Sequence, residues 1–416
     1  MRKPDVVVVG AGAAGILAAW RAASLGAAVL LLEKTERIGT KILISGGGKC
    51  NITHDGPLEA VLKAFRPNEA RFIRPACYRF TNLQIVEMLT DRGLEVYTRP
   101  DGRIFPVDST AKDVVRILAG YLDEAGVEVR LNCPVSGIEV SEGRVQGVKV
   151  GVNESILAHS VVLSVGGSSY PNSGTTGDGW VWARAIGHRV TKIRAALAPI
   201  YLNSPIPDLS GLSIRDCVVK ARLAGKEISR WRGDMLLTHH GLSGPTILGI
   251  SRIVAERMVE GPVTIEADVL PDDTFESLAA SILSWAQTHP KRLVSTYLDD
   301  IVPKNAIEPL MRAAKVANDT VAARLDKSSR NRLVTTMKGW SFGEARAVPL
   351  EKGEVVAGGI SLDEVDPHTM ESRIVEGLFV CGEVLDVAGP VGGYNLQAAF
   401  ATGYVGGESA ATFKKT

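Results

Sequence analysis

The sequence predicts an α/β fold in which a Rossmann-like dinucleotide-binding domain is interrupted by an inserted β-rich plus helical domain. The first observation is an apolar strand, Val6–Val9, which runs into a glycine-rich turn and an apolar helix. Two further apolar strands that end in glycines lie at Val161–Val165 and Gly377–Cys381. Between them, from about residue 191, short alternating strands and charged helical segments appear. Strands that alternate with helices are typical of a parallel sheet covered by helices. Because the region from about residue 191 lacks this alternation, we expect it to form a separate domain.

The length of 416 residues allows two or three domains. We expect residues 1–190 to form the first part of the dinucleotide-binding domain and residues 346–416 the second part. Residues 191–345 are expected to form an inserted substrate or lid domain. This insertion is predicted to be β-barrel-like, with a helical segment over about residues 273–333.

The glycine-rich turn has a spacing that suits a pyrophosphate. Gly10 permits the tight bend, Gly12 lets the backbone approach the anion, and Gly15 lets the helix pack closely on the strand. The helix N-terminus, which includes Ala13 and Ala14, offers unpaired N–H groups to the same anion. The next apolar strand ends at Glu33, a carboxylate suited to accept hydrogen bonds from ribose hydroxyls. The sequence therefore predicts a dinucleotide site here.

The other elements of the first part follow from periodicity and turn residues. A helix is predicted over Asn82–Arg92, and another begins after a capping residue at Ser109 or Thr110. The remaining strands are predicted at Glu95–Thr98, Arg103–Pro106, Val127–Leu131 and Val135–Val150, the last of them turning at Glu142-Gly143. A helix over Trp180–Ile186 closes this part, and the strands of the insertion are predicted at Pro199–Leu202, Cys217–Leu223 and Pro262–Val269.

Composition excludes several classes of protein. The formal net charge of +1 is typical of neither a nucleic-acid coat nor an acidic tail. The five cysteines are scattered and form no Cys/His cluster, so no metal site is expected and a reduced, cytoplasmic setting fits best. No uninterrupted apolar run reaches the length of about 18 residues that a membrane span needs.

Two further glycine runs are expected to lie against a ligand. Ser45, Gly46, Gly47 and Gly48 form a polar, glycine-rich loop, and such a run costs backbone entropy that is useful where the chain must lie flat. Gly392 and Gly393 precede the last helix, so their backbone N–H groups and the positive end of the helix dipole suit an anionic group. An ordinary glycine turn that caps a helix is the alternative.

Several motifs together carry a resemblance to a known family. They are Gly10–Gly15 with Glu33 and Lys34, Lys41 with Ser45–Asn51, Gly166–Pro171 with Thr176–Gly179, Leu237–Pro245, Gly358–Ile360, Thr369–Ser372, and Gly382-Glu383 through Gly392–Asn395. With them the whole chain resembles the BaiN/YhiN-like flavoproteins of the aminoacetone-oxidase type, in the two-dinucleotide-binding-domain flavoprotein superfamily. The resemblance implies an FAD-binding domain of the glutathione-reductase type. The chain departs from the family pattern at Pro390-Val391 and at Ala398 and Ala399, so the resemblance implies FAD but not the substrate.

The resemblance also implies which residues bind the cofactor. FAD is expected to lie extended, with its adenosine end at Glu33 and its ring near Gly46 and Gly392. Glu383 resembles an acidic residue that this superfamily directs at the ribityl or phosphate region, and Val135 is expected to contact adenine through its backbone. Gly166 is expected either to face the cofactor or to serve as a plain strand-to-loop turn. The full expected set adds Gly10, Gly12, Ala13, Ala14, Gly15, Lys34, Lys41, Ser45, Gly47, Gly48, Cys50, Asn51, Gly382, Gly393, Tyr394 and Asn395.

The catalytic candidates are a thiol and two imidazoles. Cys50 beside a flavin ring is a candidate proton donor, and the alternative is that Cys50 packs while Asn51 and the glycine backbone hold FAD. His239 and His240 precede a glycine-rich loop in the insertion, so one of them is a candidate substrate contact or proton donor, with loop ordering as the alternative. Asp178 resembles a motif shared with fumarate-reductase-like flavoproteins, and a turn and capping role is its alternative.

Three functions remain open. The first is an FAD-dependent oxidoreductase, NAD(P)H-linked, that transfers hydride between flavin N5 and an unsaturated or amine-bearing small molecule. No second glycine fingerprint follows, so NAD(P)H is expected only as a transient reductant at the same flavin face. The second is a ribosomal RNA dihydrouridine synthase, and the third a non-catalytic FAD-binding module. The sequence leaves the oligomeric state open.

Local charge bears on the RNA alternative. The stretch Arg184–Arg232 holds ten Lys or Arg residues against three acidic ones, a net of +7. Basic residues also outnumber acidic ones over Arg324–Arg346. A basic surface of the insertion would suit a phosphate backbone, and the alternative is a solvated face balanced by acids elsewhere.

Overall fold

The computed structural model describes residues 3–151 and 154–413. The chain divides into two compact units, of which the first comprises residues up to Ile193 together with residues from Val355 on, and the second comprises Arg194–Glu354. The sequence analysis set the corresponding boundaries after residues 190 and 345. Over the described ranges, no helix combines the length and the apolar character that crossing a bilayer requires.

The first unit is built on a five-stranded parallel sheet with the strand order β19-β10-β1-β2-β6. Val6 of the central strand pairs with Ser160 on one side and with Val29 on the other. The central strands are buried along their whole length, which is typical of a parallel sheet covered on both faces. The strands are β1 (Val6–Val9), β2 (Val29–Leu32), β6 (Glu128–Arg130), β10 (Ser160–Leu163) and β19 (Leu378–Val380).

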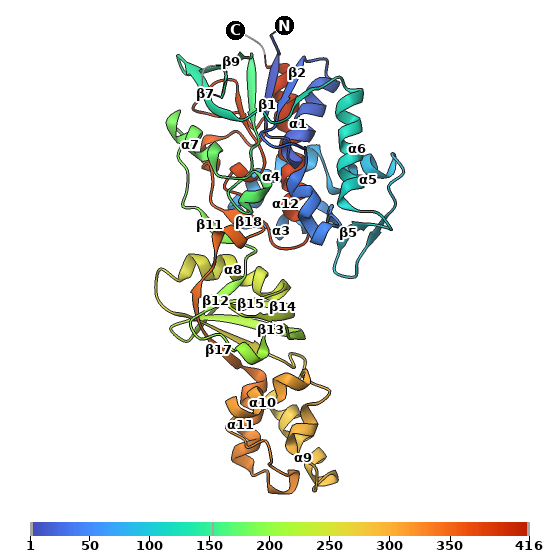
Figure 1. The fold of residues 1–416 in the computed structure, drawn as a ribbon, viewed down its shortest axis with the longest axis vertical. Helices are drawn as coiled ribbons and strands as arrows, with labels where there is room; N and C mark the ends of the chain where they lie inside the picture. The colour runs from blue at the N-terminus through green and yellow to red at the C-terminus, as the bar shows by residue number, and fades with distance from the viewer. Residues whose placement is uncertain (1–2, 152–153, 414–416) are drawn as a thin grey trace. The chain divides into compact units, whose positions relative to one another are not determined.

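The first and the last helix of the chain, α1 (Ala13–Ser24) and α12 (Tyr394–Thr412), pack against one another beside this sheet (Figure 1). The contact is made by bare backbone. A Cβ atom on Gly403 would lie 2.1 Å from the Ala14 carbonyl oxygen, and one on Gly407 would lie 2.1 Å from the Ala18 carbonyl oxygen. The small residues of α12 therefore set how closely the two helices approach.

Smaller elements surround the sheet. The helices are α2 (Thr40–Ile44), α3 (Leu58–Lys63), α4 (Pro67–Arg79), α5 (Asn82–Thr90), α6 (Ala111–Glu124) and α7 (Asp178–Ala185). One antiparallel sheet has the order β3-β5-β4 and another the order β7-β8-β9. The strands of these two sheets are β3 (Thr53–His54), β4 (Val96–Thr98), β5 (Arg103–Pro106), β7 (Val135–Ser141), β8 (Arg144–Val150) and β9 (Glu154–Leu157). A further strand of the first unit is β18 (Val355–Ala357).

Local signals in the sequence acted as expected at several element ends. Thr110 is the N-cap of α6, and its hydroxyl accepts a hydrogen bond from the Lys112 N–H group. Glu142 and Gly143 both adopt positive φ, at 51° and 74°, in the turn between β7 and β8. The short helix α2, which precedes the Ser45–Gly48 loop, was not among the predicted elements.

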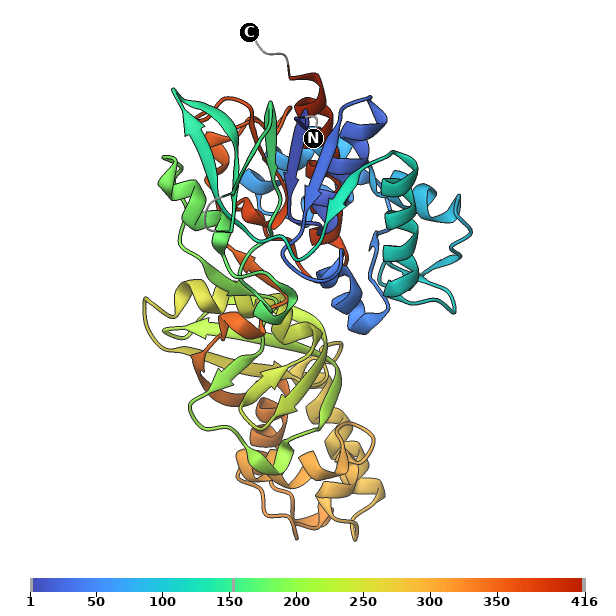
Figure 2. The same cartoon turned by 45° about the horizontal axis from the view of Figure 1, so that its top comes forward.

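The second unit contains a closed barrel with the strand order β12-β15-β14-β13-β16-β17 (Figure 2). Its longest strands, β13 and β14, form one hairpin, whereas the sequence indicated only short strands. The strands of this unit are β11 (Arg194–Ala196), β12 (Ile200–Leu202), β13 (Ser213–Leu223), β14 (Lys226–Thr238), β15 (Gly241–Ser243), β16 (Val263–Asp268) and β17 (Trp340–Ala347). The helices are α8 (Pro245–Arg257), α9 (Phe275–Thr288), α10 (Lys304–Ala313) and α11 (Lys327–Lys338).

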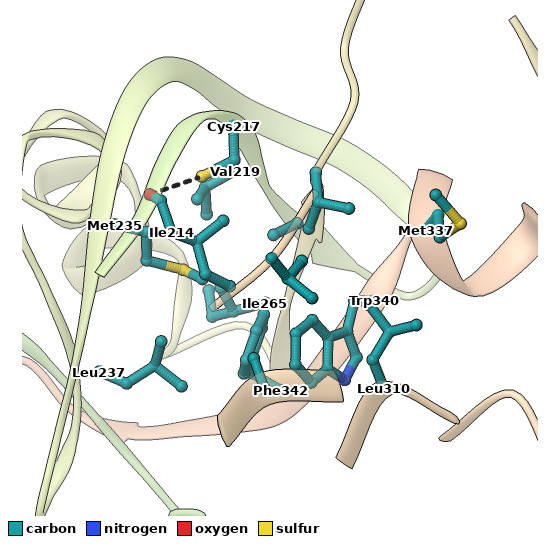
Figure 3. Close-up of a cluster of buried hydrophobic side chains, with 14 of the residues drawn as sticks. Ile214, Cys217, Val219, Met235, Leu237, Ile265, Leu310, Met337, Trp340 and Phe342 are labelled. Atoms are coloured by element: carbon teal, nitrogen blue, oxygen red, sulfur yellow. Dashed lines mark hydrogen bonds between the residues drawn. The ribbon is translucent and has the colours of Figure 1, made fainter. Parts of the chain in front are cut away.

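One hydrophobic core joins the barrel to helices α9, α10 and α11, which lie at one end of it. Trp340 and Phe342 of β17 belong to this core, as do Leu310 of α10 and Met337 of α11 (Figure 3). The Cys217 thiol donates to the Ile214 carbonyl oxygen within the same cluster, at 3.8 Å. Since the helices contribute to the barrel core, the second unit folds as one body.

Candidate functional site

The three glycines of the first turn each meet a different environment. Gly10 has a φ of +95°, and a Cβ there would lie 2.8 Å from the Ser164 carbonyl oxygen. A Cβ on Gly15 would lie 1.8 Å from the Gly10 carbonyl oxygen, so Gly15 is required by packing. A Cβ on Gly12 meets no atom within 4 Å. Gly12 thus presents bare backbone to open space at the start of α1, as a group that binds a pyrophosphate must.

Glu33 lies directly beside this turn. Its Oε2 accepts from the Ala11 N–H group at 2.9 Å, and its Oε1 accepts from the Thr35 N–H group at 2.8 Å. The Glu33 carbonyl oxygen accepts from the Cys133 N–H group at 2.9 Å, and β7 begins at Val135, two residues further on. The structure therefore brings the glycine turn, Glu33 and the Val135 region together at the carboxyl ends of β1 and β2.

Lys34 reaches across to the start of α7. Its Nζ donates to Thr176 Oγ1 at 2.6 Å and to Asp178 Oδ2 at 2.7 Å. Burial acts to raise the pKa of Asp178, but Lys34 and Thr176 outweigh it, and the net shift is downward. Asp178 is the first residue of α7, where a carboxylate also interacts favourably with the helix dipole.

Glu383 and Lys41 organise the loops at the next strand ends. Lys41 Nζ donates to Glu383 Oε2 at 2.6 Å and to Ser169 Oγ at 3.1 Å. Glu383 also accepts from the N–H groups of Gly167, at 3.3 Å, and Val356, at 3.0 Å. Within the described residues, the neighbouring Ser168 Oγ is shielded from solvent and has no hydrogen-bond partner. That hydroxyl is available to a bound group.

The segment after the triple glycine holds the N-terminus of α12. With its amide oriented to satisfy both ends, Asn51 accepts from the Gly393 N–H group at 2.9 Å and donates to the Thr53 carbonyl oxygen at 3.2 Å. Thr53 Oγ1 donates to Gln397 Oε1 at 2.9 Å. This arrangement fixes the turn that precedes α12.

His54, the last residue of β3, completes the arrangement. Its Nδ1 donates to the Gly392 carbonyl oxygen at 3.1 Å, and its ring stacks on Tyr394 with 4.5 Å between centroids. The next residue of the motif, Asn395, donates to the Gly389 carbonyl oxygen at 2.9 Å. Sequence reasoning missed His54 and Gln397, because nothing near either residue signals a partner more than 300 positions away.

Cys50 lies inside the first unit rather than on a surface. Its side chain is fully buried, and burial raises the pKa of the thiol to about 12. The backbone at Cys50 has a φ of 62°, and Gly46, Gly47 and Gly48 also have positive φ. The loop Ser45–Gly48 is therefore a tight, left-handed turn whose exposed atoms are mostly backbone.

His239 and His240 belong to the second unit. Both are exposed and form the turn between β14 and β15. The His240 ring lies 5.2 Å from the ring of Tyr201, on β12. The glycine turns, Glu33, Glu383 and Cys50 all belong to the first unit.

Ion pairs reduce the excess of positive charge predicted for Arg184–Arg232. Arg222 bonds Glu266 at 2.8 Å, and Arg232 bonds both Asp216 and Asp272, at 2.8 and 2.7 Å. Arg189 and Arg230 are also ion-paired, to Asp363 and Glu227. Several of the acids lie outside the counted stretch, so the net charge around each of these arginines is smaller than the sequence count indicates.

The residues of the first unit fit a bound FAD. Gly12 leaves space beside the first N–H groups of α1, Glu33 bonds the Ala11 N–H group of the same turn, and Ser168 offers an unpartnered hydroxyl. Gly393, with a φ of +89°, begins α12, a helix of 19 residues whose N-terminus suits the negative charge that a reduced flavin gathers. The site is thus built from several strand ends of a single sheet.

Comparisons with known proteins agree with this arrangement. Residues 4–409 match the model of the HI0933-like protein Rossmann domain. The chain is 31% identical to the ribosomal RNA dihydrouridine synthase of Haemophilus influenzae, over 96% of each chain. It is 30% identical to the 3-dehydro-bile acid delta(4,6)-reductase of Clostridium scindens, over 97% of this chain and 98% of that one.

A solved structure shares the whole fold. The 3-ketosteroid Δ1-dehydrogenase of Sterolibacterium denitrificans superimposes with a TM-score of 0.57 at 16% identity, and 100% of both chains is covered. With the family match spanning almost the entire described chain, this protein belongs to the HI0933-like Rossmann family and is an FAD-dependent oxidoreductase.

Proposed function

We propose that this enzyme reduces a carbon–carbon double bond conjugated to a carbonyl group, with NAD(P)H as the source of electrons. One observation carries the proposal: two relatives that match over nearly their full lengths are named for saturating such bonds. Dihydrouridine is uridine with its C5–C6 bond saturated, and a 3-dehydro-bile acid delta(4,6)-reductase acts on double bonds conjugated to the 3-oxo group.

Uracil in ribosomal RNA is the substrate that we place first. Besides the Haemophilus relative, the ribosomal RNA dihydrouridine synthase of Escherichia coli is 28% identical over 97% of this chain. A small enone is the second candidate, supported by the bile-acid relative. Both substrates need a hydride at one carbon and a proton at the other.

The residues of the first unit would bind and orient the cofactor, which when bound supplies hydride transfer to the activated carbon. Gly12 and the first N–H groups of α1 would hold the pyrophosphate, and Glu33 would accept from the ribose. The turn at Gly392 and Gly393 would face the pyrimidine part of the ring. Asn51 and His54 would keep that turn in place, because both bond its backbone.

The proton donor is a second question. The burial of Cys50 supports the packing role, since a thiol without an exposed surface does not meet a substrate. The exposed His239 and His240 and the half-buried His54 carry imidazoles, the side chain that most often serves as a general acid or base. We propose these three as the candidates, to be separated by replacing each with glutamine and comparing kcat for a single small enone.

The test is anaerobic reduction of the FAD-loaded protein by NADPH and, separately, NADH, followed by mixing with oxygen, a small enone and a uridine-containing ribosomal RNA fragment. Fast reoxidation by the enone or the RNA, with slow reoxidation by oxygen, is the expected result. Fast reaction with oxygen and with an amine would show an oxidase instead. Absence of reduction by either nucleotide would support a non-catalytic FAD-binding module. A cytoplasmic location stays a prediction.

A further inference from the structure

The C-terminal end of α9 carries a cluster of aromatic rings. Trp285 and His289 are stacked, with 5.3 Å between ring centroids and 19° between ring planes. Tyr297 meets Trp285 edge-on at 5.5 Å, and its hydroxyl donates to Ser281 Oγ at 2.9 Å. All three rings are half-buried, so each keeps part of its surface in solvent.

Two backbone segments bring basic residues to the same place. Residues 290–294 run antiparallel to residues 320–323, because the Ala322 N–H group donates to the Arg292 carbonyl oxygen at 2.8 Å and Ala323 N–H to that of Pro290 at 3.0 Å. The short helix Ala322–Arg324, which ends at Arg324, also contacts α9. The backbone therefore carries Lys291, Arg292 and Arg324 close to the C-terminal end of α9, and all three residues are exposed.

The charge of this surface is positive. Residues 289–300, which include Tyr297, and residues 319–332 contain six Lys or Arg residues and four acidic residues. Asp326 accepts from the Ser329 N–H group at 2.6 Å as the N-cap of α11, and Asp299, Asp300 and Asp319 are exposed. Within the part of the chain that the structure describes, no carboxylate bonds Lys291, Arg292 or Arg324. Unlike Arg222, Arg230 and Arg232 on the barrel, these cations are available to an external anion.

We propose that this surface, which comprises Trp285, His289, Lys291, Arg292 and Arg324, binds single-stranded RNA. The cations would contact phosphates, and the Trp285–His289 pair would stack on a base, a combination typical of single-strand binding. An acidic peptide would use the cations but need not carry a planar group, whereas every nucleotide supplies a base to stack on the rings. The inference rests on the proposed function, since it assigns RNA as the partner, and it adds where on the second unit the RNA is held outside the flavin site.

The test measures binding of a fluorescein-labelled oligouridylate of about 12 nucleotides to the full-length, FAD-loaded protein by anisotropy at several salt concentrations. Replacing Lys291, Arg292 and Arg324 together by glutamine is expected to weaken binding at low salt by tenfold or more. It is also expected to lower the slope of log K against log salt by about 2, since each single-strand phosphate contact contributes about 0.7.

A second variant tests the rings. Trp285→Ala is expected to weaken binding by about 5- to 150-fold with an unchanged salt slope, which corresponds to about 1–3 kcal/mol for one stacked base. Trp285→Phe, which keeps a ring, is expected to recover most of the affinity. A cooperative thermal unfolding transition and an unchanged rate of enone reduction, which needs none of these residues, show that each variant is folded.

The matched control replaces three exposed cations elsewhere in the second unit, Arg215, Lys226 and Lys304, by glutamine. Equal loss of RNA affinity in this control and in the test variant would overturn the proposal, as would wild-type binding by the test variant. If the wild-type protein reduces an enone but does not bind the RNA, the RNA-binding role of this surface is wrong and the proposed reduction of a conjugated double bond stands. If it binds RNA through these residues but reduces no double bond, the RNA-binding role stands and the proposed function is wrong.

Discussion

Lys41 Nζ and Glu383 Oε2 lie 2.6 Å apart, and this ion pair ties α2 to the loop after β19. The exposed fractions of the two side chains are 24% and 17%, so the pair is partly shielded from water. Glu383 also accepts from two backbone N–H groups, and the pair therefore connects four segments of the first unit.

Glu383→Gln is expected to lower the free energy of unfolding by about 1–2 kcal/mol and to weaken FAD binding, because Lys41 loses its counter-charge in a partly buried place. Urea unfolding and the fluorescence of released FAD measure the two effects. Glu376→Gln is the control: its pair with Arg144 spans 3.6 Å and its side chain is 49% exposed, so a change within about 0.5 kcal/mol is expected. An equal effect of both substitutions would contradict the connecting role of Glu383.

The glycines of the first turn are expected to separate cofactor binding from folding. The methyl group of Gly12→Ala would point into open space, and alanine readily adopts the φ of −84° found there. The free energy of unfolding should therefore change by less than about 0.5 kcal/mol while FAD affinity falls. Gly15→Ala places a Cβ 1.8 Å from a carbonyl oxygen and should disrupt the fold itself. Apoprotein unfolding and FAD titration distinguish the two. Loss of stability without loss of FAD affinity in Gly12→Ala would refute the assignment.

The contact between α1 and α12 gives a second glycine comparison. Gly403→Ala is expected to destabilise by about 1–3 kcal/mol, because the added methyl group forces two packed helices apart. Gly120→Ala, in the middle of α6 with no atom within 4 Å, is expected to stabilise by about 0.5–1 kcal/mol through helix propensity alone. Chemical denaturation of the two variants should therefore shift in opposite directions, and shifts of the same sign would argue against close packing at Gly403.

His188 makes stability depend on pH. Its Nε2 accepts from Ser372 Oγ at 2.9 Å, and its Nδ1 donates to Glu364 Oε2 at 3.0 Å. Burial lowers the pKa of His188 although Glu364 opposes the shift, so the unfolded chain takes up the proton first. This contribution to stability is complete above about pH 6.5 and is lost as the pH falls below it.

The measurement is the free energy of unfolding between pH 8 and pH 5 for the wild type and for His188→Gln. His188→Gln should be less stable than the wild type at pH 8, and the difference should shrink as the pH falls. A constant difference between His188→Gln and the wild type would show that His188 does not titrate with unfolding.

The cysteines are expected to differ in reactivity. Cys50 is fully buried with its pKa raised to about 12, whereas Cys133 keeps a partly exposed side chain. Native titration with a thiol reagent should therefore modify Cys133 first, and Cys133→Ala should remove that reaction. Cys50→Ala should keep the rate of substrate-dependent flavin reoxidation within about threefold, at a stability cost of about 1 kcal/mol. A loss of a hundredfold or more would restore Cys50 as the proton donor.

The sequence predicted the elements whose cause is local. The strand Arg103–Pro106 was placed with its correct ends, and of the two predicted capping residues, Ser109 and Thr110, Thr110 is the N-cap. The length of the β13–β14 hairpin was underestimated, because polar and charged residues occur throughout both strands. Such long strands become favourable only when the barrel closes and pairs them with their neighbours.

The backbone conformation of the candidate site was predicted, but the side chains that hold it in place were not. The close backbone contacts of Gly10 and Gly15 follow from one short motif, and the binding of a pyrophosphate at Gly12 stays a prediction. The bonds of Asn51 to Gly393 and of Thr53 to Gln397 join positions more than 300 residues apart, so no local pattern announces them. The ion pairs of Arg222 and Arg232 likewise depend on partners brought in by the fold.

The position of α12 at the end of the chain has a consequence for biosynthesis. The parallel sheet lacks its edge strand β19, and α1 lacks its packing partner, until residues beyond Val355 have left the ribosome. The insertion Arg194–Glu354 is complete before then and has its own core, so it is free to fold first. The N-terminal glycine turn, although made earliest, would acquire its cofactor only after translation of the last helix.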